Sequence, residues 1–155
     1  MLMLTPSLTE LRDYQGQVVG HSPWMTVSQA MIQAFADATG DHQWIHVDVE
    51  RARAESPWRS PVAHGFLTVS LIPQLNTQVL QVSGTSASIN YGLNKLRFPA
   101  AVKAGSAIRT QMALQELTQV DEHRYLASYH TTVEIEGEDK PACVAENLVM
   151  YVTGG

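Results

Sequence analysis

Cysteine is almost missing from this chain of 155 residues, in which Cys143 is the only one. A single cysteine excludes an intrachain disulfide and any zinc site built from several cysteines. A lone thiol also fits a reducing compartment, so we expect a cytoplasmic protein.

Long apolar runs and basic clusters are missing as well. The most apolar stretch, residues 65–80, is interrupted by Pro73 and several polar residues, so it is too short and too polar to span a bilayer. The first twenty residues carry charges and lack the apolar run of a signal peptide. Ten basic against fifteen acidic residues give a net charge of −5, which makes nucleic acid a poor partner. We therefore expect a soluble protein that binds neither nucleic acid nor membrane.

Helical signals fill the first half of the chain. The length and the 45% hydrophobic content suit one domain over residues 1–155. Ser28 is a suitable N-cap for a helix over residues 29–39, whose apolar side chains recur at helical spacing, and Gly40 is a suitable end. Asp48 is placed to cap a second, shorter helix over residues 49–55, and the segment between the two helices is expected to be a loop.

A longer apolar helix is expected after Pro61, a residue suited to a first helical turn. Its apolar residues run from Phe66 to Leu75 and lie nearly all the way round, which is typical of a helix buried on most sides.

The second half of the chain changes to the alternating pattern of half-buried antiparallel strands. These strands are expected over residues 85–98, weakened near Gly92, and over 108–115, 125–135 and 148–152. A turn is expected at residues 136–139, and an earlier extended segment at 18–27. One apolar helix covered by an antiparallel sheet is an α+β fold.

The clearest chemistry lies in Asp41 and His46, which are five residues apart in the expected loop. A carboxylate and an imidazole that converge on one point can hold a water molecule and remove its proton. The alternative is that Asp41 caps a turn and His46 is an ordinary loop histidine. His42 and His46 have the spacing of a helical metal pair, but the H-E-x-x-H context is missing, so we expect no metal.

A second candidate is Gly65, in the first turn of the apolar helix. Free backbone N–H groups at a helix start favour negative charge, and glycine lets a ligand approach them closely. A thioester carbonyl that becomes an enolate needs such a donor. Alternatively, Gly65 permits close packing, and the neighbouring His64 is a structural histidine.

Two segments resemble the signatures of the MaoC-like dehydratases. Residues 35–48, FADATGDHQWIHVD, resemble that family's hydratase motif, and the D-x-Q-W-I-H-V-D form is similar to the nodulation-protein-N-like branch. Residues 62–67, VAHGFL, resemble the second signature, and 96–99, LRFP, the end of a later strand. The match covers about residues 16–110 in the right order. Gln43 and Trp44 stand where the family usually has Asn-Pro.

The resemblance implies a hot dog fold, a homodimer and an acyl-CoA or acyl-carrier-protein thioester as substrate, with no cofactor. Asp41 and His46 correspond to the catalytic pair, and Gly65 to the oxyanion donor. Gln43 and His64 are expected beside the substrate. The implied reaction adds water across a trans-2-enoyl thioester and gives a (3R)-hydroxyacyl product.

Two alternatives remain open on the same fold. Hot dog thioesterases usually carry a carboxylate on the central helix, whereas residues 61–80 contain no Asp or Glu. A non-catalytic acyl-binding module is disfavoured by the presence of both Asp41 and His46.

Overall fold

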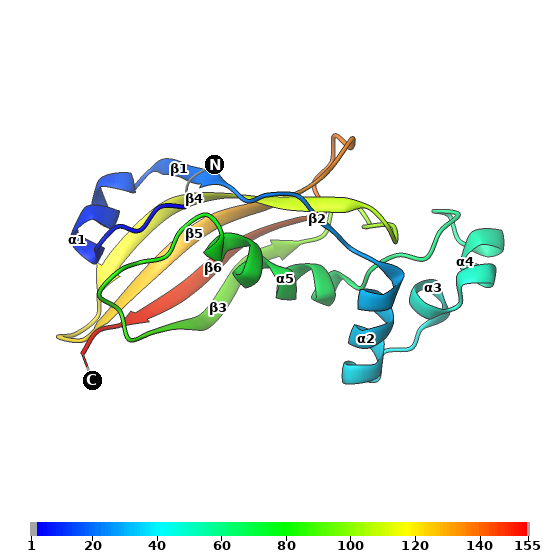
Figure 1. Cartoon of the computed structure of the whole chain (residues 1–155), viewed down its shortest axis with the longest axis horizontal. Helices are drawn as coiled ribbons and strands as arrows, with labels where there is room; N and C mark the ends of the chain where they lie inside the picture. Colours follow the sequence, from blue (N-terminus) through cyan, green and yellow to red (C-terminus); the bar gives the residue numbers. More distant parts are fainter. Residues whose placement is uncertain (1–2, 155) are drawn as a thin grey trace.

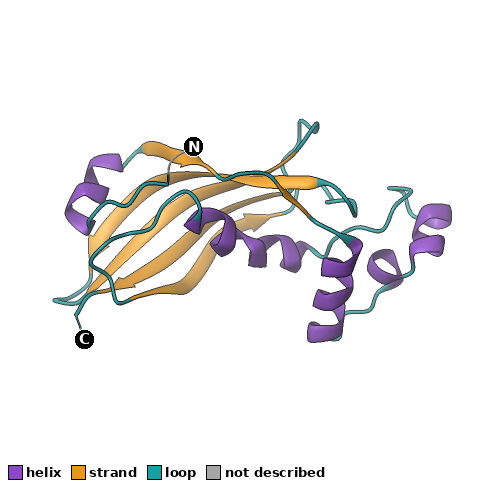
Figure 2. Cartoon of the chain, in the orientation of Figure 1, coloured by secondary structure: helices purple, strands orange, loops and turns teal. Residues whose placement is uncertain are grey.

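The computed structural model describes residues 3–154 of the chain (Figures 1 and 2). Its helical segments are α1 (Leu8–Leu11), the 3₁₀ turn η1 (Arg12–Tyr14), α2 (Gln29–Thr39), α3 (Trp44–Val47), α4 (Val49–Glu55) and α5 (Gly65–Thr77). Its strands are β1 (Gln17–His21), β2 (Met25–Thr26), β3 (Ala87–Arg97), β4 (Ala107–Gln119), β5 (Arg124–Ile135) and β6 (Cys143–Val152).

The strands form one antiparallel sheet in the order β1-β4-β5-β6-β3, with β2 also paired to β4. The sheet curves around α5, which contacts β4 and β6 (Figure 1). The helices α2, α3 and α4 lie together beyond one end of the sheet, next to the start of α5 (Figure 1). This is the α+β hot dog fold expected from the sequence.

The alternating pattern of the strands is confirmed. On β4 the side chains of Ile108, Thr110, Met112 and Leu114 are buried while their neighbours are only partly covered, because one face meets α5 and the core. Strand β3 differs, since nearly all its residues are exposed at the edge of the sheet. The expected weakness near Gly92 is a register shift in its pairing with β6.

The expected start of the long helix at Pro61 is wrong, because α5 begins at Gly65 with His64 as its N-cap. The preceding segment is extended: the Val62 N–H donates to the Ile45 carbonyl, and the Ala63 N–H to the Val102 carbonyl. These two N–H groups are therefore paired with distant carbonyls, although the sequence pattern places Val62 and Ala63 in a helix.

The expected burial of α5 on most sides is also wrong. Leu67, Ile72 and Leu75 are buried against the sheet, whereas Phe66 is 67% exposed. The sheet covers one side of the helix, so its apolar residues divide between the core and the surface.

The caps of α2 and α4 are confirmed. The Ser28 and Asp48 side chains accept hydrogen bonds from backbone N–H groups in the first turns, and Gly40 ends α2 with a left-handed φ of 80°. The segment between the two helices is not wholly a loop, since α3 forms one short helical turn over Trp44–Val47. That turn carries His46 into the interior, where it is 6% exposed.

Buried apolar residues form two clusters. One lies between α5, α2 and the adjoining parts of β4, β5 and β6, and contains Cys143. The other packs α1 against the opposite end of β4, β5 and β6. Burial raises the pKa of the Cys143 thiol to about 11, so this cysteine behaves as a small apolar residue. No helix within residues 3–154 has the length and hydropathy needed to cross a membrane.

Candidate active site

Hydrogen bonds fasten the Asp41–His46 loop to the segment that leads into α5. The Ile45 carbonyl accepts from the Val62 N–H at 3.0 Å, and His46 Nδ1 lies 2.6 Å from the Val62 carbonyl oxygen. Further along, His64 Nε2 lies 2.9 Å from the main-chain oxygen of Asp41. The two motifs that are separate in sequence therefore meet at one place.

Three side chains converge there. Ligand-type atoms of Asp41, His46 and His64 all lie within 4.8 Å of one another. The two imidazole rings stack with centroids 3.7 Å apart and planes inclined by 24°. Two hydrogen bonds of about 2.8 Å that meet at a tetrahedral angle span about 4.6 Å. The cluster is therefore of the right size to hold one water molecule.

His46 is arranged as a base. The Val62 carbonyl can only accept, so the proton of a neutral His46 sits on Nδ1 and leaves the lone pair on Nε2. Burial lowers the pKa of His46, and the neighbouring His64 lowers it further. The hydrogen bond to Val62 and the charge of Asp41 act in the opposite direction without reversing the shift. His46 is therefore neutral near neutral pH.

His64 is 3% exposed and links α5 to the loop. Its Nε2 faces the Asp41 main-chain carbonyl and so carries the proton of the neutral ring. Its Nδ1 is buried and has no hydrogen-bond partner in the described part of the chain. This lone pair is available to a water molecule or a ligand in the site.

His42 lies apart from this cluster. Its Nε2 is 2.9 Å from Asp37 Oδ1 on the exposed side of α2, and this contact raises the pKa of His42 and lowers that of Asp37. The third group beside Asp41 and His46 is instead His64. Two imidazoles and a carboxylate are also donors that bind divalent cations.

Gln43 holds the loop through its main chain. Its backbone N–H donates to Asp41 Oδ1 at 3.4 Å, and it is the N-cap residue of α3. The side chain is exposed and forms no hydrogen bond within residues 3–154.

Gly65 is the first residue of α5, so its N–H has no carbonyl partner within the helix. Gly65 and His46 both line a cavity of about 370 Å³, together with Thr68 and Phe98. A Cβ atom at position 65 would meet the Phe98 ring at 3.0 Å. Glycine therefore keeps the start of α5 open beside the cavity.

Two residues that support the site, Gln29 and Val62, have roles that the sequence does not predict. The Gln29 side chain donates to the His46 carbonyl at 2.7 Å and fastens α2 to α3. Val62 contributes its main-chain N–H and carbonyl, which every residue except proline carries, so its amino-acid type gives no signal. Gln29 follows the predicted N-cap Ser28, but nothing in the local pattern indicated a partner seventeen residues away.

The chain is similar to known proteins along most of its length. A family model described as MaoC like domain matches residues 11–135. The chain is 49% identical over 146 residues to 3-hydroxyacyl-thioester dehydratase Z of Mycobacterium tuberculosis, covering 94% of this chain and 96% of that protein. It is 43% identical over 140 residues to nodulation protein N of Rhizobium leguminosarum, covering 90% and 87%.

Among solved structures, an (R)-hydratase from Pseudomonas aeruginosa superposes with a TM-score of 0.73 at 25% identity, over 96% of this chain and 86% of that one. A monoamine oxidase regulatory protein from Archaeoglobus fulgidus superposes with a TM-score of 0.76 at 21% identity, over all of both chains. With the family match and these relatives, the chain belongs to the MaoC-like family.

Proposed function

We propose that this protein is a hydratase that adds water reversibly to trans-2-enoyl thioesters and gives (3R)-hydroxyacyl products. The observation that carries the proposal is the cluster of Asp41, His46 and His64 within 4.8 Å, in which His46 presents an unprotonated Nε2. The names of the relatives, a 3-hydroxyacyl-thioester dehydratase and an (R)-hydratase, describe the two directions of such a reaction.

The proposed mechanism assigns steps to Asp41, His46 and Gly65. Water between Asp41 and His46 gives a proton to His46 Nε2 while its oxygen bonds to the β carbon. The π electrons of the double bond move toward the thioester oxygen, where the Gly65 N–H stabilises the enolate. The Asp41 carboxylate stabilises the imidazolium formed on His46. That imidazolium then returns its proton to the α carbon, so the product has gained one water.

The proposal is tested by following the loss of enoyl absorbance with a panel of trans-2-enoyl-CoAs, with chiral analysis of the 3-hydroxy product. An assay of free thiol on the same acyl-CoAs detects a thioesterase. Thiol release without hydration, or no turnover of any enoyl-CoA, would contradict the proposal. Activity that is lost with a chelator and restored by a divalent cation would replace the metal-free mechanism with a metal-assisted one.

Because the pKa of His46 is lowered, we expect kcat/KM to fall only at an unusually low pH. The base form is lost only when pH falls below the pKa of His46 in the folded enzyme, which lies below the ordinary 6.5. A plot of log kcat/KM against pH should therefore stay level through 6.5 and bend downward at a lower value. An acid limb centred at or above 6.5 would contradict the assignment of His46 as a buried base.

We also propose a homodimer formed through β3. This strand pairs with β6 on one side, and no other strand within residues 3–154 pairs with its second edge. It exposes Ile89, Tyr91 and Leu93 by 49%, 61% and 44%. A long apolar edge strand is prone to pair with another chain, and a second copy offers the same unpaired donors and acceptors.

Light scattering on a sizing column should give twice the chain mass of 17.1 kDa for the wild-type protein. Introducing charge with Ile89→Lys and Leu93→Lys is expected to yield monomers, because lysines on an edge strand oppose pairing. Val120→Lys is a matched control, since Val120 is 48% exposed and lies outside β3. A wild-type monomer, or a variant dimer as stable as the wild type, would exclude this interface.

A further inference from the structure

Two adjoining cavities of about 440 and 420 Å³ lie between α5 and the strands β3 and β6. Pro73, Asn90 and Asn147 belong to the walls of both. From α5, the walls include Val69, Pro73 and Asn76, which are one turn apart on a single side of the helix. Gly65 lies one turn before Val69 on that same side, so the helix face that lines the cavities begins at the proposed thioester position.

The wall of the larger cavity combines apolar side chains, among them Leu80, Met112 and Val149, with buried polar groups that a plain alkyl chain would leave unpaired. Asn76 Nδ2 donates to Thr131 Oγ1 at 3.4 Å, and Thr131 Oγ1 donates to Asn147 Oδ1 at 2.5 Å. Asn76 is 8% exposed, and its Oδ1 has no hydrogen-bond partner in the described part of the chain. Burying a carbonyl oxygen without a hydrogen-bond donor costs free energy. The Asn76 side-chain oxygen therefore favours a ligand that can donate a hydrogen bond to it.

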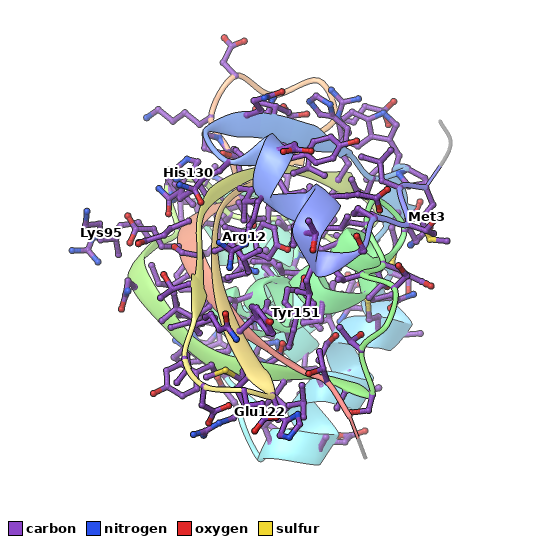
Figure 3. The ribbon with its side chains drawn as sticks, turned by 90° about the vertical axis from the view of Figure 1, so that its left-hand side faces the viewer. Met3, Arg12, Lys95, Glu122, His130 and Tyr151 are labelled. Carbon is purple, nitrogen blue, oxygen red and sulfur yellow. The ribbon has the colours of Figure 1, made fainter. Side chains whose placement is uncertain are left out.

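The same wall carries a spare donor. The hydroxyl groups of Tyr129 and Tyr151 lie 2.6 Å apart, and a hydrogen bond between them uses only one of their two protons. Neither hydroxyl forms another hydrogen bond within residues 3–154. Burial raises the pKa of both phenols, so both protons are retained. Figure 3 shows Tyr151 inside the ribbon, in contrast to Lys95 on its outer edge.

We propose that the acyl group of the substrate carries a hydroxyl far from the thioester, and that this hydroxyl donates to Asn76 Oδ1 and accepts from the Tyr129–Tyr151 pair. A hydroxyl both donates and accepts, which matches one spare acceptor and one spare donor. This placement rests on the proposed function, because that function puts the thioester at Gly65. Gly65 and Asn76 are eleven residues apart, roughly 16 Å along the helix, which an extended chain of about thirteen bonds would span.

The experiment compares two saturated acyl-CoAs of equal length, about twelve carbons, one with a terminal hydroxyl and one without. Binding is measured by calorimetry and needs no turnover, while hydration of the matching trans-2-enoyl-CoAs is assayed separately. We expect the hydroxylated ligand to bind the wild-type protein about tenfold more tightly, since the unhydroxylated chain leaves two buried groups unpaired.

Asn76→Leu is expected to reverse this preference. The double variant Tyr129→Phe with Tyr151→Phe keeps both rings and is expected to abolish most of the preference. Tyr14→Phe, in η1 and outside both cavities, is the matched control and should keep it. If Asn76→Leu does not fold, the tyrosine pair decides the question.

Equal binding of the two ligands by the wild-type protein overturns the inference. Hydration of enoyl-CoAs would stand in that case. Conversely, a preference in binding without hydration of any enoyl-CoA refutes the proposed function and leaves the hydroxyl site in place.

Discussion

Replacing Asp41 by Asn or His46 by Gln is expected to lower kcat for enoyl-thioester hydration by roughly 10²–10⁴-fold, the usual contribution of general acid–base catalysis. Asn has the shape of Asp without its charge, and Gln keeps a polar side chain but cannot take up a proton. Initial rates on trans-2-enoyl-CoA, with circular dichroism to verify folding, measure the effect.

The double variant sharpens this test. Asp41 and His46 act on one water molecule, so the double variant is expected to lose about as much activity as the more damaging single variant. The matched controls are Asp37→Asn and His42→Gln, an exposed pair of the same types formed between α2 and the loop that follows it, which should keep wild-type rates. Wild-type turnover in both Asp41→Asn and His46→Gln would end the assignment of these residues as catalytic.

The second large effect is expected from Gly65→Pro. Proline at the first helical position removes the backbone N–H without breaking the helix. The preceding His64 has φ −59° and ψ 139°, a conformation that proline tolerates in its neighbour. Loss of one oxyanion donor costs roughly 10²–10³-fold in kcat. Rates at saturating substrate are therefore expected to fall by that amount, while the thermal unfolding midpoint changes little.

Gly65→Ala distinguishes the loss of the backbone N–H donor from crowding by an added Cβ atom. Alanine adds the same Cβ toward Phe98, where the contact is 3.0 Å, and keeps the N–H. Phe98 is 40% exposed and has room to shift, so Gly65→Ala should lose much less activity than Gly65→Pro. Equal losses in the two variants would indicate that crowding against Phe98, and not the missing donor, is responsible.

The parts of the fold that the sequence predicted are those set by local signals. Ser28, Gly40 and Asp48 mark helix ends because caps act within one turn, and the β4 and β5 strands follow from alternation along a few residues. Local signals misplace the start of α5, because Val62 and Ala63 form backbone hydrogen bonds with Ile45 and Val102. Such partners are distant in sequence and leave no local trace.

The same distinction holds for the candidate site. Asp41, His46 and Gly65 were indicated by spacing and by resemblance, and the structure places them near one another. The stack of His46 on His64 was not foreseen, because the two rings come from separate motifs and meet only when the loop docks on the start of α5. Polar residues at Asn76 and Asn147 gave no signal until the fold placed them around one cavity.

The acceptor that orients His46 is a peptide carbonyl of Val62 and not a side chain. Every amino acid carries that oxygen, so genetic drift at position 62 leaves the tautomer of His46 unchanged as long as the backbone keeps its path. A histidine oriented by an aspartate loses its partner through a single codon change. Most substitutions of Val62 therefore leave the proton of the neutral His46 ring on Nδ1.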